Sequence, residues 1–222
     1  TTEIYTLSLH DALPISLIDQ VDVVDVCTPT YLHMGHVIAA AHAGKHVICE
    51  KPIARTLEQG EEMIRICRDA GVQLLIAHVV RFFPEYARAK AVVDSGEIGQ
   101  VAVVRLSRCG FKPAANIPDS WFHDPEKSGG MMLDLMIHDF DYARWVAGEV
   151  ESVYARSATG ANATAPLDHG LAILRHHNGA LSHIEGSWAY PPPLFRTALE
   201  IAGSEGLIEH PAGNANAIEM YL

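Results

Sequence analysis

Three short apolar segments alternate with two amphipathic segments between residues 21 and 78, and this alternation constrains the fold more than any other feature. The apolar segments are expected to be strands at 21–27, 46–49 and 72–78, with helices at 31–43 and 56–70 between them. A βαβαβ pattern requires parallel strands that are joined by right-handed crossovers. We therefore predict an α/β first domain, a partial Rossmann-like parallel sheet, over residues 17–80.

Beyond residue 80 the pattern changes to a run of strands with few helices. Helices are expected at 84–95 and 131–147, and strands at 101–109, 151–157, 171–175, 180–187 and 197–202. Asn178-Gly179 is typical of a tight hairpin turn between two of these strands. Residues 81–222 therefore predict an α+β domain with a mostly antiparallel open sheet.

The charge balance disfavours two classes of partner. The chain has 16 Lys and Arg residues against 27 Asp and Glu residues, a formal net charge of −11. This negative charge repels nucleic acid and anionic membranes, and no apolar segment approaches the ~18 residues that cross a bilayer. The cysteines form no C-x-x-C pair, which favours reduced thiols and a cytoplasmic protein: Cys27, Cys49, Cys67 and Cys109.

Candidate ligand-binding residues follow the predicted parallel strands. Thr28, Lys51 and His78 fall at the carboxyl ends of the three strands, where ligands bind in doubly wound sheets. A desolvated Lys51 can donate a hydrogen bond to a substrate oxygen and stabilise developing negative charge. The simpler alternative is a surface lysine that precedes a turn. His33 follows Thr28 closely enough to occupy the first turn of the next helix and to face the same crevice.

A second set of polar residues occupies the helix expected at 131–147. Asp134, His138 and Asp141 are spaced at i, i+4 and i+7, so a continuous helix would place them on one face among apolar neighbours. A carboxylate one turn before a histidine can orient the imidazole and raise its basicity, as a general base for a hydroxyl proton requires. Two alternatives remain open here: a buried, hydrogen-bonded structural cluster, or three ligands of a metal ion without the H-E-x-x-H spacing of a strong site.

Four segments, taken in order, resemble the glucose-fructose oxidoreductase, inositol dehydrogenase and rhizopine catabolism (Gfo/Idh/MocA) family of oxidoreductases. They are VDVVDVCTPTYLH, AGKHVICEKPIA, RFFP and GGMMLDLMIHDFDYARWVAG, beginning at Val21, Ala43, Arg81 and Gly129. AGKHVICEKP combined with the downstream D-x-x-x-H-x-x-D is specific for this family, and the resemblance extends to about residue 206. It implies a dinucleotide-binding domain and an α+β domain whose open sheet forms a homo-oligomer interface.

The resemblance also implies roles for individual residues, with no metal ligand among them. Lys51, Asp134 and His138 are the catalytic candidates: Lys51 contacts the substrate and the nicotinamide of NAD or NADP, while Asp134 and His138 bind sugar or polyol hydroxyls. His138 accepts the hydroxyl proton as hydride leaves the same carbon. Arg81 and Trp121 are further substrate-binding candidates. The other candidates line the cofactor crevice: Cys27, Thr28, Pro29, His33, Glu50, Pro52 and His78.

The sequence departs from the family pattern at both ends. No opening strand with a G-x-G-x-x-G turn precedes residue 21, so ~60 residues are expected to be missing ahead of residue 17, at about 30 residues per βαβ unit. The resemblance also implies that the last residue, 222, falls within the second domain. We therefore expect an inactive enzyme fragment with 21–27 as an exposed edge strand, poor solubility and no saturable NAD(H) or NADP(H) binding.

Residues 6–16, TLSLHDALPIS, resemble neither a signal peptide nor a capped helix. One reading frame of a common sequencing adapter, ACT CTT TCC CTA CAC GAC GCT CTT CCG ATC T, encodes TLSLHDALPI. We therefore expect residues 1–16 to be a non-native leader, with the native sequence starting near Leu17. A natural leader segment is the alternative, and unrelated codons over residues 6–16 of the gene would favour it.

Two other functions stay open from the sequence. A metal-dependent sugar isomerase or epimerase would use Asp134, His138 and Asp141 as ligands and would be inhibited by chelators. A non-catalytic sugar or dinucleotide sensor would keep the fold without turnover, although the presence of both Lys51 and His138 argues against it. The sequence does not identify the sugar, and the segment that discriminates NAD from NADP is absent.

Overall fold

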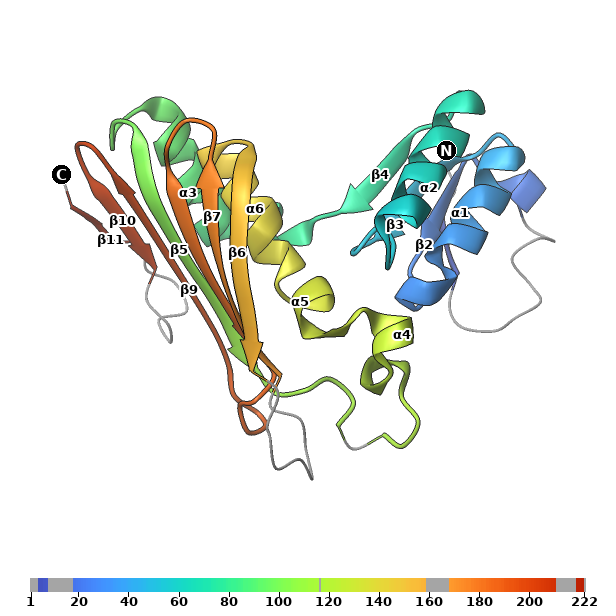
Figure 1. Cartoon of the computed structure of the whole chain (residues 1–222). Helices are drawn as coiled ribbons and strands as arrows, with labels where there is room; N and C mark the ends of the chain where they lie inside the picture. The colour runs from blue at the N-terminus through green and yellow to red at the C-terminus, as the bar shows by residue number, and fades with distance from the viewer. Residues whose placement is uncertain (1–3, 8–17, 116, 159–167, 211–218, 222) are drawn as a thin grey trace. The chain divides into compact units, whose positions relative to one another are not determined.

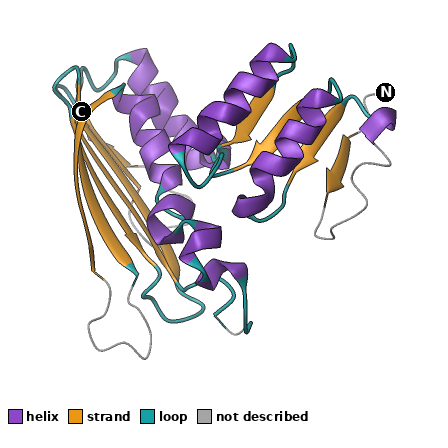
Figure 2. Cartoon of the chain, turned by 45° about the vertical axis from the view of Figure 1, so that its right-hand side comes forward, coloured by secondary structure: helices purple, strands orange, loops and turns teal. Residues whose placement is uncertain are grey.

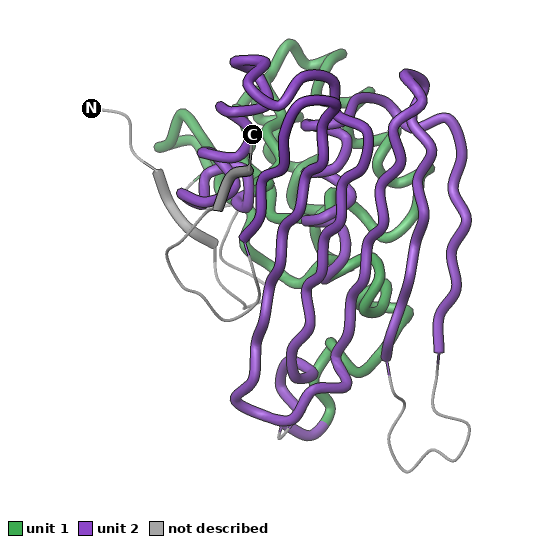
Figure 3. The backbone as a smooth tube through the Cα atoms, turned by 90° about the vertical axis from the view of Figure 1, so that its left-hand side faces the viewer, with its two compact units in different colours: residues 1–78, 119–134 green, residues 79–118, 135–222 purple. Residues whose placement is uncertain are grey.

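The computed structural model describes residues 4–7, 18–115, 117–158, 168–210 and 219–221 (Figure 1). The chain forms two compact units: unit 1 comprises residues 1–78 and 119–134, and unit 2 comprises residues 79–118 and 135–222 (Figure 3). Each unit contains one of the two sheets in the described part of the chain. None of the helices in that part is both long and apolar enough to span a bilayer.

Unit 1 contains a parallel sheet whose described strands follow the order β1-β2-β3-β4 (Figure 1). The central register places Val24 opposite Val47 and Cys49 opposite Ile76. The elements are β1 Ile4–Leu7, β2 Val23–Val26, α1 His33–His42, β3 His46–Glu50, α2 Leu57–Asp69 and β4 Leu74–Ala77. The predicted Rossmann-like parallel sheet with intervening helices is therefore confirmed.

The core of unit 1 lies between one face of this sheet and helices α1 and α2. Its fully buried side chains include Val26 of β2, Val37 of α1, Val47 of β3 and Met63 of α2. Local sequence signals set the helix ends: Thr56 caps α2 by accepting a hydrogen bond from the backbone N–H of Gln59. Gly44 ends α1 with a φ of 70°, a conformation that glycine adopts without strain. The helices thereby return the chain to the sheet, so that β2 and β3 end at the same edge.

Strand β1 overturns one sequence expectation. It pairs in parallel with β2, with Ile4 opposite Val23 and Leu7 opposite Val26, so the expected exposed edge at 21–27 is wrong. The short β-favouring segment IYTL supplies the backbone donors and acceptors that this edge would otherwise present to solvent. The remainder of the expected leader, residues 1–3 and 8–16, lies outside the described residues, and the predicted poor solubility stays a prediction.

Residues 119–134 belong to unit 1, whereas the sequence pattern grouped them with the rest of 81–222. They form η5 Trp121–His123, α4 Pro125–Ser128 and α5 Gly130–Asp134. Within unit 1, the ammonium group of Lys127 in α4 lies 5.9 Å from the ring centroid of Tyr31, which precedes α1. Such tertiary contacts are invisible to a pattern that is read along the sequence, which explains the difference.

Unit 2 contains a mostly antiparallel sheet whose described strands follow the order β11-β10-β9-β5-β8-β7-β6 (Figure 1). The pairing of β5 with β8 is parallel, and the predicted Asn178-Gly179 turn joins β7 to β8. The elements are η4 Val79–Phe82, α3 Pro84–Ser95, β5 Val101–Gly110, α6 Ile137–Ala147, β6 Val150–Ala158, β7 His169–His176, β8 Leu181–Ser187, β9 Phe195–Gly203, β10 Leu207–His210 and β11 Glu219–Tyr221. The predicted α+β fold with a mostly antiparallel sheet is confirmed.

The two faces of this sheet differ in what covers them. Helices α3 and α6 pack on one face (Figure 2), where alternating strand residues such as Leu106 and Ile184 are buried. The intervening residues Leu171, Ile173 and Leu181 point to the other face, where they are 40%, 46% and 45% exposed. This second face is the open face of the sheet, as an α+β domain with helices on one side requires.

The single helix expected around Asp134 and His138 is two helices, because α5 ends at Asp134 and α6 begins at Ile137. The carbonyl oxygen of Asp134 accepts a hydrogen bond from Lys51 Nζ at 2.8 Å. This bond satisfies one of the acceptors that the end of a helix leaves unpaired. The expectation that Asp134 shares one helix face with His138 and Asp141 is therefore wrong, because the interruption separates it from them.

Candidate active site

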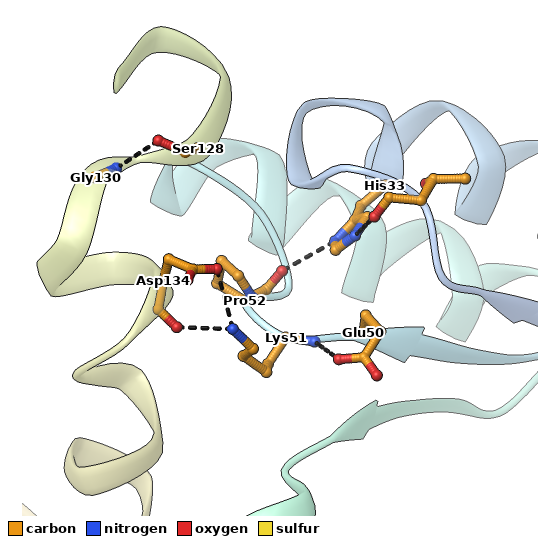
Figure 4. Close-up of polar contacts among 8 residues, drawn as sticks. His33, Glu50, Lys51, Pro52, Ser128, Gly130 and Asp134 are labelled. Carbon is orange, nitrogen blue, oxygen red and sulfur yellow. Dashed lines mark hydrogen bonds and ion pairs between the residues drawn. The ribbon is translucent and has the colours of Figure 1, made fainter. Parts of the chain in front are cut away.

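Lys51 follows β3 directly, at the edge where the parallel strands of unit 1 end. Its Nζ donates hydrogen bonds to the carbonyl oxygen of Asp134 at 2.8 Å and to Oδ1 of the same residue at 3.0 Å (Figure 4). The Lys51 and Asp134 side chains are 17% and 11% exposed. An ammonium group has three N–H donors. Among the described residues these bonds use two of them, which leaves one donor of Lys51 for a ligand oxygen.

The backbone around Lys51 is held by His33 and Glu50. Glu50 Oε2 accepts a hydrogen bond from the backbone N–H of Lys51 at 3.1 Å. His33 is buried, and its ring nitrogens lie 2.9 Å from the carbonyl oxygen of Thr28 and 3.0 Å from that of Pro52 (Figure 4). His33 thus joins the loop after β2 to the loop after β3, in the first turn of α1 where the sequence placed it.

The other residues that were predicted to line a cofactor crevice also belong to unit 1. Pro29 and Pro52 are buried, His78 is half-buried after β4, and Cys27 is exposed after β2. Thr28 Oγ1 is buried and has no hydrogen-bond partner among the described residues. Because buried hydroxyls normally have a partner, this atom fits a site that a polar ligand group completes.

Cys27 is a poor candidate for nucleophilic chemistry at this edge. Partial desolvation and the neighbouring Asp25 carboxylate raise the pKa of the Cys27 thiol to about 11. Because the thiolate is the reactive form of cysteine, the neutral thiol of Cys27 is inert at physiological pH. A role in lining a ligand site is compatible with this state.

His138 lies in the first turn of α6 in unit 2, next to a fully buried ion pair. Arg108 donates from Nε to Asp139 Oδ2 at 2.9 Å and from a terminal nitrogen to Asp139 Oδ1 at 3.0 Å. The same terminal nitrogen lies 3.2 Å from the Tyr86 hydroxyl oxygen. Burial opposes the charge on Arg108, but the Asp139 carboxylate holds the pKa of Arg108 above its usual value. Both carboxylate oxygens accept N–H groups, so the geometry requires an ionised Asp139.

A second bidentate pair lies on the same helix. Arg81 donates to both carboxylate oxygens of Asp141, at 2.7 and 2.6 Å, and lies 5.2 Å from the ring centroid of Trp145. The hydrogen bond to Asp141 raises the pKa of Arg81. Asp141 is therefore engaged by a guanidinium group, which argues against its alternative role as a metal ligand. Among the described residues, no three His, Cys, Asp or Glu side chains gather as a metal site would require.

The predicted site residues divide between the two units. Lys51, Asp134 and Trp121 belong to unit 1, and Arg81 and His138 belong to unit 2. Trp121 is half-buried and stacks on Phe122, with 3.9 Å between ring centroids. The joint action of Lys51 and His138 on one substrate stays a prediction, as do the substrate-binding roles of Arg81 and Trp121.

The pair of Arg108 and Asp139 was missed in the sequence. One signal was present, because Arg108 lies in phase with Val104 and Leu106 on the buried side of β5. An arginine at such a position requires a buried counter-charge, and Asp139 is the fully buried acidic residue that supplies it.

Comparison with known families identifies both halves of the chain. Residues 4–78 match a model described as an oxidoreductase family with an NAD-binding Rossmann fold, and residues 86–209 match the GFO/IDH/MocA C-terminal domain. The chain belongs to the GFO/IDH/MocA family of oxidoreductases. The resemblance that the sequence motifs indicated is thereby confirmed.

Several relatives in this family are named as sugar or polyol dehydrogenases. Levoglucosan dehydrogenase of Pseudarthrobacter phenanthrenivorans is 32% identical over 87% of this chain, and myo-inositol 2-dehydrogenase of Thermotoga maritima is 34% identical over 85%. Each match covers 56% of the relative, so this GFO/IDH/MocA chain spans little more than half of their length. A solved levoglucosan dehydrogenase in complex with NADH and L-sorbose superposes with a TM-score of 0.82 at 31% identity, covering 93% of this chain and 59% of that one.

Proposed function

We propose that the protein containing this chain is an NAD(P)-dependent oxidoreductase that acts on a CH–OH group of a sugar or polyol. The proposal rests on Lys51, which follows a parallel strand and is half-buried. Two of the three donors of its ammonium group are fixed by Asp134. A fixed donor of this kind is suited to a carbinol oxygen whose negative charge grows during oxidation. Membership of an oxidoreductase family with an NAD-binding fold supports the same reaction class.

The cofactor would be held by residues at the carboxyl ends of the parallel strands, in a nucleotide-binding domain over residues 17–80. Thr28 would contribute its buried, unpartnered hydroxyl, and the other lining positions would be Cys27, Pro29, His33, Glu50, Pro52 and His78. The nicotinamide, when bound, accepts or donates the hydride. The protein's task is to orient the substrate carbon and to exclude water.

Proton transfer is assigned to His138 in the proposed substrate and oligomerisation domain, residues 81–222. The imidazole would accept the hydroxyl proton from the substrate, while Lys51 stabilises the oxygen. Asp134 would orient the Lys51 ammonium group through the bonds described above. Asp141 occupies two N–H donors of Arg81, so Arg81 would bind the substrate only through its remaining N–H groups.

The substrate class is proposed to be a neutral sugar or cyclic polyol. The names of two relatives, levoglucosan dehydrogenase and myo-inositol 2-dehydrogenase, support this class without selecting one compound. Hydroxyl groups need paired donors and acceptors, and the combination of Lys51 with Asp134 offers both. Neutral polyols are also compatible with a chain whose net charge of −11 would repel anions.

The test is an activity screen on the product of the full open reading frame that encodes this chain. Reduction of NAD⁺ and NADP⁺ is measured with a panel of sugars, anhydrosugars and inositols. Lys51→Met should lower kcat/KM by about 10²-fold or more, and His138→Gln should lower kcat by about 10²-fold, as for loss of an oxyanion donor or of a general base. Turnover should survive extensive chelation, which separates this reaction from that of a metal-dependent isomerase.

Matched controls are available on the same elements. Lys45 precedes β3 at its opposite end, and His42 is an exposed residue at the end of α1. Lys45→Met and His42→Gln should leave kcat and KM unchanged. Wild-type turnover in both Lys51→Met and His138→Gln would contradict the proposal, and so would cofactor-independent conversion of a sugar.

We further propose that the open face of the unit 2 sheet forms a homo-oligomer in the cytoplasm. Its exposed Leu171, Ile173 and Leu181 lie on adjacent strands, where they form an apolar surface on an otherwise mixed face. Ile173→Lys should shift the mass measured by light scattering toward the monomer. A monomeric wild-type protein, or an unchanged mass for Ile173→Lys, would contradict this assembly.

A further inference from the structure

His33 makes two hydrogen bonds of the same chemical kind from a fully buried ring. The residue is 1% exposed and is the first residue of α1. Its Nε2 lies 2.9 Å from the carbonyl oxygen of Thr28, and its Nδ1 lies 3.0 Å from that of Pro52 (Figure 4). Both distances are typical of N–H···O hydrogen bonds.

The chemistry of these two partners bears on the number of protons that the ring carries. A backbone carbonyl oxygen only accepts hydrogen bonds, whereas a neutral imidazole donates from one nitrogen and presents a lone pair at the other. A neutral His33 would therefore direct a lone pair at a carbonyl oxygen about 3 Å away. We propose that His33 is an imidazolium, a buried cation that donates from both nitrogens and clamps together the loops after β2 and β3.

The electrostatic surroundings favour this charge. Glu50 and Asp134 carry negative charge beside the positive charge of Lys51 in the same cluster (Figure 4), and Asp25 lies on β2. An imidazolium at His33 offsets this excess of carboxylates. Burial and the N-terminus of α1 act in the opposite direction, because desolvation and a helix dipole both disfavour a cation there. In the proposed state the two carbonyl dipoles and the carboxylates outweigh both effects.

Cys27 provides a separate indication of the sign of the local field. Its pKa is raised to about 11 by partial desolvation and by the carboxylates of Asp25 and Glu50. The carboxylates that disfavour a thiolate favour an imidazolium, whereas desolvation disfavours both charged forms. The donor count at His33 and the negative field at the ends of β2 and β3 thus agree.

The clamp gives His33 a positioning role for Lys51. Pro52 follows Lys51 directly, so the bond to the Pro52 carbonyl fixes the chain on one side of the lysine, and Glu50 fixes its N–H on the other. Loss of one ring proton would turn one of the two attractive bonds into a repulsion between lone pairs. The loop that carries Lys51 would then be held less tightly. This inference concerns the fold of unit 1 and does not depend on the proposed reaction.

His176 is a matched control within the same molecule. It is 0% exposed, with Nδ1 2.6 Å from the carbonyl oxygen of Gly148 and Nε2 2.7 Å from Ser182 Oγ. A hydroxyl can donate as well as accept, so a neutral His176 with its proton on Nδ1 satisfies both bonds. The two buried histidines therefore differ in one partner only, and the structure predicts two protons on His33 and one on His176.

The experiment is nitrogen-15 NMR of the imidazole rings in the intact 222-residue chain at neutral pH. His33→Gln and His176→Gln identify the two rings by loss of their signals, and sequential assignment replaces either variant that does not fold. The expected result is a protonated pair of nitrogens at His33 and a single protonated nitrogen at His176. A singly protonated His33 would overturn the proposal.

A second measurement tests the clamp itself. Amide hydrogen exchange is followed at Lys51 and Ile53 while the pH is raised until the NMR signals of His33 show loss of one proton. The protection factors of these amides, which correct for the intrinsic exchange rate at each pH, should fall about tenfold. The protection factor of Met63 in the core of α2 should stay constant. Unchanged protection at Lys51 and Ile53 after deprotonation would show that His33 does not position this loop.

Discussion

Each unit contains an ion pair that joins a helix to a strand or to the residue after it, and the two pairs differ in burial and in their remaining hydrogen-bonding capacity. Lys51 and Asp134 are 17% and 11% exposed, whereas Arg108 and Asp139 are 4% and 0% exposed. Lys51 keeps a donor beyond its bonds to Asp134, while Asp139 is bound at both oxygens by Arg108. The first pair thus keeps a donor for the proposed ligand, whereas the second is fully used in joining α6 to β5.

The difference matters because burial changes what an ion pair contributes to stability. A fully desolvated pair rarely stabilises a protein more than apolar side chains of similar size would, yet removal of one partner is costly. Such a pair instead specifies one arrangement of the elements that it joins. We expect Arg108 and Asp139 to do so beside His138, because helix α6 has no side-chain cap of its own at its N-terminus.

The largest expected effect is the loss of one partner of the buried pair. Asp139→Asn leaves the Arg108 guanidinium without its counter-charge and should lower the free energy of unfolding by about 3–5 kcal/mol. Urea denaturation followed by tryptophan fluorescence measures this loss. The control is Arg144→Gln, which changes a residue of the same helix and disrupts its exposed pair with Glu149, a residue beyond the helix end; it should change little. A loss below about 1 kcal/mol for Asp139→Asn would mean that Arg108 finds another partner or water.

Replacement of both partners should have a smaller effect, of opposite sign. The double variant Arg108→Met with Asp139→Leu removes both buried charges and fills the space with apolar side chains. Its free energy of unfolding should equal that of the wild type or exceed it by about 1–4 kcal/mol. If the pair also orients the neighbouring His138, the double variant should be stable but should have a lower kcat in the full-length enzyme. Equal destabilisation in the single and double variants would contradict the desolvation argument.

The contrast between the pairs also explains which features the sequence could predict. The strands predicted between residues 21 and 202, the α2 cap at Thr56 and the turn at Gly179 depend on residues close in sequence, and the structure has them near the predicted positions. Strands β1, β10 and β11 were not predicted. The interruption after Asp134 was missed, and the carbonyl oxygen at that point binds Lys51, 83 residues away in the chain. The pair of Arg108 with Asp139 likewise joins segments 31 residues apart.

The family motifs identified Lys51 and Asp134 individually, but they did not reveal that these two residues bind each other. Local patterns predict which side chains are polar within apolar segments. They do not predict which partner each side chain meets, because the partner depends on how the strands and helices pack. For the same reason the two carbonyl partners of His33 became visible only in the structure.

Asp134→Asn should have a moderate effect on stability. The Lys51 ammonium keeps its bond to the Asp134 carbonyl oxygen and loses only the charged partner, and the pair is partly solvated. We expect a loss of about 1 kcal/mol in the free energy of unfolding, well below that of Asp139→Asn. Both variants are measured side by side in urea, and a loss at Asp134 as large as that at Asp139 would erase the distinction between the pairs.

The smallest expected effect belongs to a third, solvent-exposed ion pair in α2. Arg65 binds Glu62 and Asp69, and all three side chains are more than a third exposed, so solvent and salt screen the attraction. Arg65→Gln should leave the unfolding transition unchanged within error. The hydrogen bond from Arg65 lowers the pKa of Glu62, so the same variant should return that pKa toward its ordinary value.

The sign of the pH effect follows from this lowered pKa. Because the folded-state pKa of Glu62 lies below its unfolded value, the pair stabilises the fold above the unfolded pKa, and the contribution disappears as the pH falls through the folded pKa. NMR titration of Glu62 in the wild type and in Arg65→Gln measures the shift directly. A clear loss of stability in Arg65→Gln at neutral pH would show that solvent exposure does not predict how much the ion pairs of Arg108, Lys51 and Arg65 contribute to stability. The assignment of the Lys51 pair as a ligand-ready site would then need support other than burial.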